Sequence, residues 1–338
     1  MSDVTIGMLL LVLAGVATAS FTLPMKFTRR WAWENTWLAW TIFALLVLPP
    51  LVTFLTVPHL RQVYSQTAIS ALLAAFFFGA GWGVAQVFFG IAVEAIGIAL
   101  TFSLVLGTSA AVGTMVPLLR LHPERVHTTA GHLVIGAVLL VLLGVGICAL
   151  AGRARERTLH LATPTRGKGN TGLLLALLCG LGASFVNFGL TFGAPLIDMA
   201  KELGASPSMA ANAVWLPLMF AGAIPNLAYC AFLMRKNNSR GRFAGGGAGH
   251  WALAFLMAVF WFGSTLLYAA AAEHLGSLGP ILGWPLFMSL IVITASLLGI
   301  FTGEWKNTGK RPLTTQLAGV AVLVAAVFLL AHASQLVS

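Results

Sequence analysis

The sequence predicts an all-α polytopic membrane protein whose ten transmembrane helices form two inverted five-helix repeats. Hydrophobic residues make up 59% of the 338 residues and charged residues only 8%, whereas a soluble domain carries about 25% charged residues. Ten apolar stretches are long enough to cross a bilayer, which takes about 20 residues. Basic residues gather in every second connection between these stretches, as they do on the cytoplasmic side of a membrane.

The predicted spans are separated by short connections. They cover residues 4–24, 37–57, 69–96, 98–119, 132–152, 171–194, 209–234, 251–272, 277–301 and 313–333. The odd-numbered connections hold 3, 0, 5, 4 and 3 Lys or Arg residues, and the even-numbered ones hold 1, 2, 1 and 0. Because basic loops stay in the cytoplasm, we expect both termini outside it. The same loops account for the net charge of +10, so no basic face remains for nucleic acid.

The first span could instead be read as a cleavable signal peptide. Residues 17–19, Ala-Thr-Ala, resemble a cleavage site, but no Lys or Arg precedes them and Asp3 does. Cleavage would also translocate Lys26, Arg29 and Arg30 across the membrane, against the charge rule. We therefore expect the first span to be retained.

An internal repeat relates the two halves of the chain. Trp82 precedes Glu94 by twelve residues, and Trp261 precedes Glu273 by the same distance. Because each half has an odd number of spans, the second half must be inserted upside down relative to the first, as in carriers that open to either side of a central site. The expected segments are a first repeat at 1–152, a cytoplasmic linker loop at 153–170 and a second repeat at 171–338.

Polar and aromatic side chains recur on single faces of several spans. In the third span Gly79, Gly83 and Gln86 share one helix face, and Trp82 lies beside it. Aromatic rings with neutral amides and hydroxyls suit an uncharged sugar. The candidate substrate-binding residues are Trp82, Gln86, Ser184, Asn187, Trp261, Thr265, Tyr268 and Trp284.

Each of these residues also has a structural interpretation. Glycines four residues apart favour helix packing, with Gln86 bonded across the interface, and Ser or Thr side chains often bond their own helix backbone. Tryptophans also belt the membrane interface, which we expect for Trp31, Trp33 and Trp37.

No charged residue lies near the middle of any span, which argues against an ion channel and a strongly charged substrate. Five charges lie at span ends: Lys26, Glu94, Asp198, Lys201 and Glu273. We hypothesise that Glu94–Lys26 and Glu273–Lys201 help to close two gates, and that one of the glutamates or Asp198 binds a coupling proton. The alternative is that these charges snorkel into water.

Motifs for catalysis, cofactors and metals are missing. The Gly303–Arg311 segment has five residues between its glycines and Arg311 where a P-loop needs Ser or Thr. No His, Asp or Glu cluster has metal-ligand spacing, and Cys148, Cys179 and Cys230 fall inside spans. We expect no catalytic residue, no metal and no cofactor other than a coupling proton.

Four segments resemble a known family with compatible spacing along nearly the whole chain: Pro24–Glu34, Phe78–Gly83, Leu203–Pro207 and Gly303–Pro312. They are similar to the L-rhamnose–proton symporters, ten-helix members of the drug/metabolite transporter superfamily. The resemblance implies a multi-pass carrier of the bacterial inner membrane that takes up a deoxy sugar with a proton. Residues 84–89, Val-Ala-Gln-Val-Phe-Phe, depart from the Asn- and Tyr-bearing family pattern, so the expected substrate is L-rhamnose or a related deoxy sugar.

Three other functions stay open at this point. An exporter of drugs or metabolites could have the same architecture. A membrane-embedded enzyme should show a polar catalytic cluster, and a receptor or structural protein should show a larger loop; the sequence shows neither.

Overall fold

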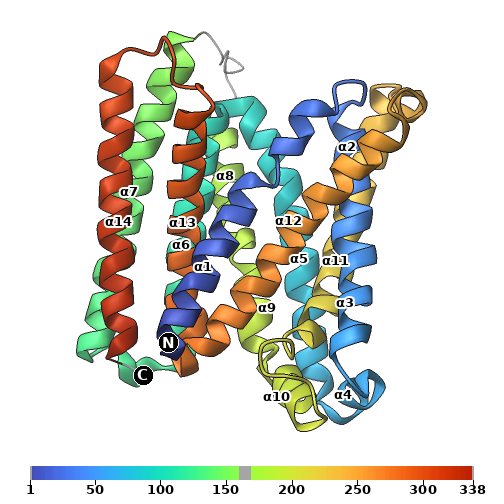
Figure 1. The fold of residues 1–338 in the computed structure, drawn as a ribbon, viewed down its shortest axis with the longest axis vertical. Helices are drawn as coiled ribbons and strands as arrows, with labels where there is room; N and C mark the ends of the chain where they lie inside the picture. The colour runs from blue at the N-terminus through green and yellow to red at the C-terminus, as the bar shows by residue number, and fades with distance from the viewer. Residues whose placement is uncertain (1, 160–168, 337–338) are drawn as a thin grey trace. The chain divides into compact units, whose positions relative to one another are not determined.

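The computed structural model describes residues 2–159 and 169–336, and every regular element in them is a helix (Figure 1). The α-helices are α1 (Asp3–Ser20), α2 (Trp33–Thr41), α3 (Leu48–Thr56), α4 (Leu60–Gln66), α5 (Ile69–Ile96), α6 (Ile98–Leu121), α7 (Thr129–Thr158), α8 (Gly169–Ala183), α9 (Phe185–Phe192), α10 (Ala194–Glu202), α11 (Asn212–Lys236), α12 (Gly247–His274), α13 (Gly279–Phe301) and α14 (Lys310–Gln335). Ten segments of these described residues are long and apolar enough to cross a membrane. The predicted fold class is confirmed.

Two spans are built from more than one helix. The second span runs Trp33–Thr56 and contains a π-helical stretch, Ile42–Val47, between α2 and α3. Pro49 and Pro50 follow after one residue, Leu48. They lack the N–H groups that would continue α-helical bonding, and their rings push the preceding carbonyls outward. The sixth span, Gly169–Glu202, comprises α8, α9 and α10.

The chain forms two compact units that do not coincide with its sequence halves. Unit 1 comprises Met1–Val16, Phe88–Asn187 and Ala271–Ser338, and unit 2 comprises Ala17–Val87 and Phe188–Ala270. The fourth, fifth, ninth and tenth spans lie wholly in unit 1, and the second and seventh wholly in unit 2. Within each unit these spans form pairs that are five spans apart, namely the fourth with the ninth, the fifth with the tenth and the second with the seventh. The predicted repeat pairs the same spans. The inverted repeat and its boundaries stay predictions, and residues 160–168 of the expected linker lie outside the described residues.

In unit 1, α7 packs along α14, and α6 packs against α7, α8 and α13. Close approach of α7 and α14 depends on glycine: a Cβ at Gly319 would lie 2.6 Å from the Cys148 Sγ, and one at Gly144 would lie 2.8 Å from the Leu323 Cγ. The start of α1 and the end of α14 lie at one end of this unit, and α7 finishes at the other (Figure 1). An even number of spans likewise places both termini on the same side of the membrane.

In unit 2, α5 packs directly on α11. A Cβ at Gly83 would lie 2.5 Å from the Gly222 carbonyl oxygen, and one at Gly79 would overlap the Leu218 carbonyl. Two backbones meet here without side chains between them, so the packing interpretation of Gly79 and Gly83 is confirmed.

A buried carboxylate anchors a turn in the same unit. Glu34 is 4% exposed, and its Oε1 accepts hydrogen bonds from the Ser239 hydroxyl at 2.5 Å and the Asn237 amide at 3.1 Å. The Asn35 amide donates to the Ser239 carbonyl at 3.1 Å. The turn after α11 is thereby fixed to the start of α2. Trp31, expected at the lipid interface, is instead buried against Phe243 and other rings, whereas Trp33 is 40% exposed.

Candidate substrate and coupling sites

Four tryptophans of unit 2 form a continuous aromatic group, which we call the tryptophan cluster: Trp37, Trp40, Trp82 and Trp261. The rings of Trp82 and Trp261 stack with centroids 5.2 Å apart and planes 20° apart. Trp40 meets Trp261 edge-on at 5.2 Å and lies 4.5 Å from Trp37. The two tryptophans that the predicted repeat places at equivalent positions therefore touch each other, on α5 and α12.

Not every indole N–H of the tryptophan cluster has a hydrogen-bond partner. The Trp37 indole N–H donates to the Asn226 side-chain oxygen at 3.1 Å. Trp40 is 1% exposed, and its indole nitrogen has no hydrogen-bond partner in the described chain. A buried donor without a partner costs about 1–3 kcal/mol. A ligand hydroxyl that reached Trp40 would remove that penalty.

Three predicted substrate residues lie on the same two helices as the stacked pair. Gln86 is four residues after Trp82 on α5 and is partly exposed. The Thr265 hydroxyl donates to the Phe262 carbonyl of its own helix at 2.7 Å, as the structural interpretation expects. Tyr268 is 1% exposed. Gln86 is therefore the most accessible polar group of the three.

The other predicted substrate residues converge on α6 in unit 1. The Ser184 hydroxyl and the Trp284 indole N–H both donate to the Ser109 carbonyl, at 3.2 and 2.9 Å. The Asn187 amide donates to the Gly113 carbonyl at 2.9 Å. These donors hold the sixth and ninth spans against the fourth. The buried hydroxyls of Ser109 and Thr114 have no partner in the described chain and are the free polar groups of this region.

The five predicted gate residues are more accessible. Lys26, Glu94, Asp198 and Glu273 are exposed, and Lys201 is partly exposed. Lys26 and Lys201 belong to unit 2, and their predicted partners Glu94 and Glu273 belong to unit 1. Both pairings stay predictions.

Sequence reasoning missed the two buried carboxylates, Glu34 and Glu156, which are 4% and 6% exposed. The remaining seven Asp and Glu residues are partly or fully exposed. One sequence signal was available for Glu156, because it is the only acid within the basic 153–157 run.

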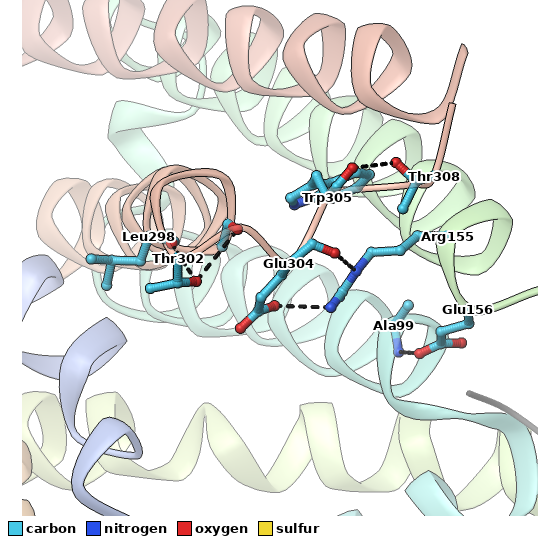
Figure 2. Close-up of polar contacts among 9 residues, drawn as sticks. Ala99, Arg155, Glu156, Leu298, Thr302, Glu304, Trp305 and Thr308 are labelled. Carbon is cyan, nitrogen blue, oxygen red and sulfur yellow. Dashed lines mark hydrogen bonds and ion pairs between the residues drawn. The ribbon is translucent and has the colours of Figure 1, made fainter. Parts of the chain in front are cut away.

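Glu156 lines a pocket of unit 1, which we call the end pocket, of about 280 Å³. It lies among α6, α7, α13 and α14, and its polar lining is Ser103, Cys148, Arg155, Glu156, Ser296, Glu304, Trp305 and Gln316. The Glu156 Oε1 accepts the Ala99 backbone N–H at 2.9 Å. Figure 2 shows Glu156 beside Arg155 near the end of α7.

Arg155 holds the segment after α13. Its Nε donates to the Glu304 carbonyl at 2.9 Å, and its Nη2 donates to the Glu304 Oε2 at 3.0 Å (Figure 2). The guanidinium also lies 5.6 Å from the Trp305 ring centroid. In the described residues no group of three or more His, Cys, Asp or Glu could hold a metal ion.

The sequence model of the L-rhamnose-proton symport protein (RhaT) family matches residues 1–334. The chain is also 28% identical over 331 residues to L-rhamnose-proton symporters of Salmonella typhi, Salmonella paratyphi B and Salmonella newport. Each alignment covers 96% of this chain and 96% of the relative.

Proposed function

The chain belongs to the L-rhamnose-proton symport protein family, and we propose that it carries L-rhamnose or a related deoxy sugar across the inner membrane. It is a proton-coupled sugar transporter, not an enzyme, and its described residues contain ten candidate membrane spans. The family match over residues 1–334 is the observation on which this conclusion rests.

The tryptophan cluster is the proposed wall of the sugar site. A sugar ring presents C–H faces that pack on an aromatic plane and hydroxyls that donate and accept hydrogen bonds. The stacked Trp82 and Trp261 supply the plane, and the unpaired Trp40 indole and the accessible Gln86 amide supply polar partners. A mainly aromatic wall with a few placed polar groups is typical of small-molecule sites.

Within unit 1 the unpaired hydroxyls of Ser109 and Thr114 are the polar groups left available to a ligand. Ser184, Asn187 and Trp284 position the α6 backbone around them through the bonds described above. Ser184, Asn187 and Trp284 are therefore proposed to support the site without contacting the sugar.

The charged span ends are proposed to close the two gates during alternating access, with both termini outside the cytoplasm. Glu94–Lys26 would close the cytoplasmic side and Glu273–Lys201 the outer side. The exposure of Glu94, Asp198 and Glu273 supports a role for these acids at the gates.

Uptake by proteoliposomes tests the proposal. The purified protein should accumulate radiolabelled L-rhamnose, or another deoxy sugar found in a counterflow screen, when a proton gradient points inward, and a protonophore should abolish accumulation. Gln86→Ala should weaken this uptake, while Gln62→Ala, an exposed amide on α4, serves as the matched control. Transport only of cationic amphiphiles would contradict the proposal in favour of an exporter.

A further inference from the structure

Glu156 is a buried acid that lines a pocket of about 280 Å³, and no part of the sugar site uses it. We propose that Glu156 binds the coupling proton. The inference rests on the proposed function, because it assigns the residue that links proton and sugar movement.

The fold gives this carboxylate an unusual partner. Glu156 lies in the last turn of α7, and its Oε1 accepts the N–H of Ala99 in the first turn of α6. The N-cap residue of α6 is Gly97, at φ 85°, and it has no side chain with which to cap the helix. Glu156 therefore supplies from a neighbouring helix the negative charge that a helix N-terminus favours.

No cation neutralises Glu156 within the described residues. Its neighbour Arg155 is bonded twice to Glu304 and stacked over Trp305. The other ionisable side chains that face the end pocket are Glu304, from the segment after α13, and Cys148, from α7. The polar groups contributed by α6, α13 and α14 are neutral, namely Ser103, Ser296 and Gln316.

The charges around the pocket favour proton binding over ion binding. Two carboxylates and one guanidinium leave the lining with one excess negative charge. A bound anion would meet both carboxylates, and a metal ion would meet Arg155. A proton requires only water to deliver it, and a pocket of about 280 Å³ has room for several water molecules.

Proton binding at Glu156 would act directly on α6. In the ionised state the carboxylate makes a charge-assisted bond to the Ala99 N–H. Transfer of a proton from pocket water to the carboxylate gives a neutral acid, which weakens that bond and removes the charge from the helix N-terminus. The same helix carries Ser109 and Gly113, whose carbonyls hold Trp284 and Asn187. The proton is thereby linked to the helix that supports the sugar site.

The decisive variant is Glu156→Gln, which cannot titrate but whose side-chain oxygen can still accept the Ala99 N–H. In proteoliposomes it should still exchange sugar in counterflow, with a rate that no longer depends on pH, and it should lose proton-driven accumulation. In detergent, the sugar-induced proton uptake that a pH indicator detects in the wild type should also be lost. Glu156→Asp, which keeps a titratable group on a shorter side chain, should retain coupling with an altered pH profile.

Two matched acids serve as controls. Glu34→Gln changes the other buried carboxylate, and Glu124→Gln changes one that is 63% exposed at the far end of unit 1. Both should accumulate sugar with normal pH dependence. Normal accumulation by Glu156→Gln, or uncoupling by Glu34→Gln alone, would overturn the assignment. If Glu156→Gln does not fold, a folded Glu156→Asp that accumulates sugar with the pH profile of the wild type would overturn it as well. A wild-type protein that moves no sugar with protons would instead refute the proposed function.

Discussion

The contact between α5 and α11 gives the sharpest test of the packing. We predict that Gly79→Ala destabilises the protein, because the new Cβ would lie 2.7 Å from the Leu218 carbonyl carbon, whereas ordinary contacts begin at 3.4 Å. The Leu218 carbonyl oxygen lies closer still, so the helices would have to separate by more than 0.7 Å, the difference between those two distances. Overpacking costs about 1–3 kcal/mol. Backbone atoms cannot rotate away as a side chain can, so we expect the upper half of that range.

Thermal unfolding of the purified protein in detergent, followed by tryptophan fluorescence, measures the effect. The expected decrease in the melting temperature is about 4–6 °C, taking roughly 2 °C per kcal/mol for a chain of this size. Gly263→Ala is the matched control, since it lies inside α12 of the same unit and a Cβ there would meet nothing within 4 Å. Its melting temperature should be unchanged or higher, because alanine favours the helix. Equal melting temperatures for the two variants would refute the packing argument.

Three further predictions concern the sites. Trp40→Phe keeps a ring but removes the unpaired indole N–H, so its sugar affinity should fall roughly tenfold, the effect of about 1.4 kcal/mol. Unchanged affinity in counterflow would exclude Trp40 from the site. Asn187→Ala should lower the melting temperature because it leaves the carbonyls of Gly113 and Pro280 without their donor. Gln86→Ala should instead weaken uptake and leave the melting temperature unchanged. The reverse pattern would contradict the supporting role of Asn187 and the binding role of Gln86. Arg155→Lys keeps the charge, but a lysine cannot bond the Glu304 carbonyl and carboxylate in one plane. It should therefore destabilise the protein by about 1 kcal/mol or less, as expected for an ion pair whose side chains are 22% and 36% exposed. A loss of stability as large as that of Gly79→Ala would show that the pair does more than hold one loop.

Hydropathy predicted the spans well because few kinds of structure can cross a bilayer. The predicted third span, 69–96, has the same bounds as α5. The fifth span shows the limit of the method. The apolar stretch ends near residue 152, but α7 continues to Thr158, since a helix can extend into water once its polar side chains leave the hydrocarbon. Arg155 and Glu156 therefore lie on a rigid helix, where the sequence suggested a basic loop.

The candidate site was only partly predictable. The equal spacing from Trp82 and Trp261 to their glutamates identified two rings that do stack. The unpaired groups of Trp40, Ser109 and Thr114 could not be found in this way, because hydrogen bonding depends on which backbone atoms approach in three dimensions. Serine and threonine look alike in sequence whether they bond their own helix, as Thr265 does, or remain unpaired.

The three cysteines have a practical consequence for labelling work. Cys179 and Cys230 are 1% and 0% exposed inside helices, so maleimide reagents should not modify them. Cys148 differs because it is 8% exposed and lines the end pocket. The native chain thus carries its own reporter, and the alkylation rate of Cys148 would reveal how often that space admits a small reagent during transport.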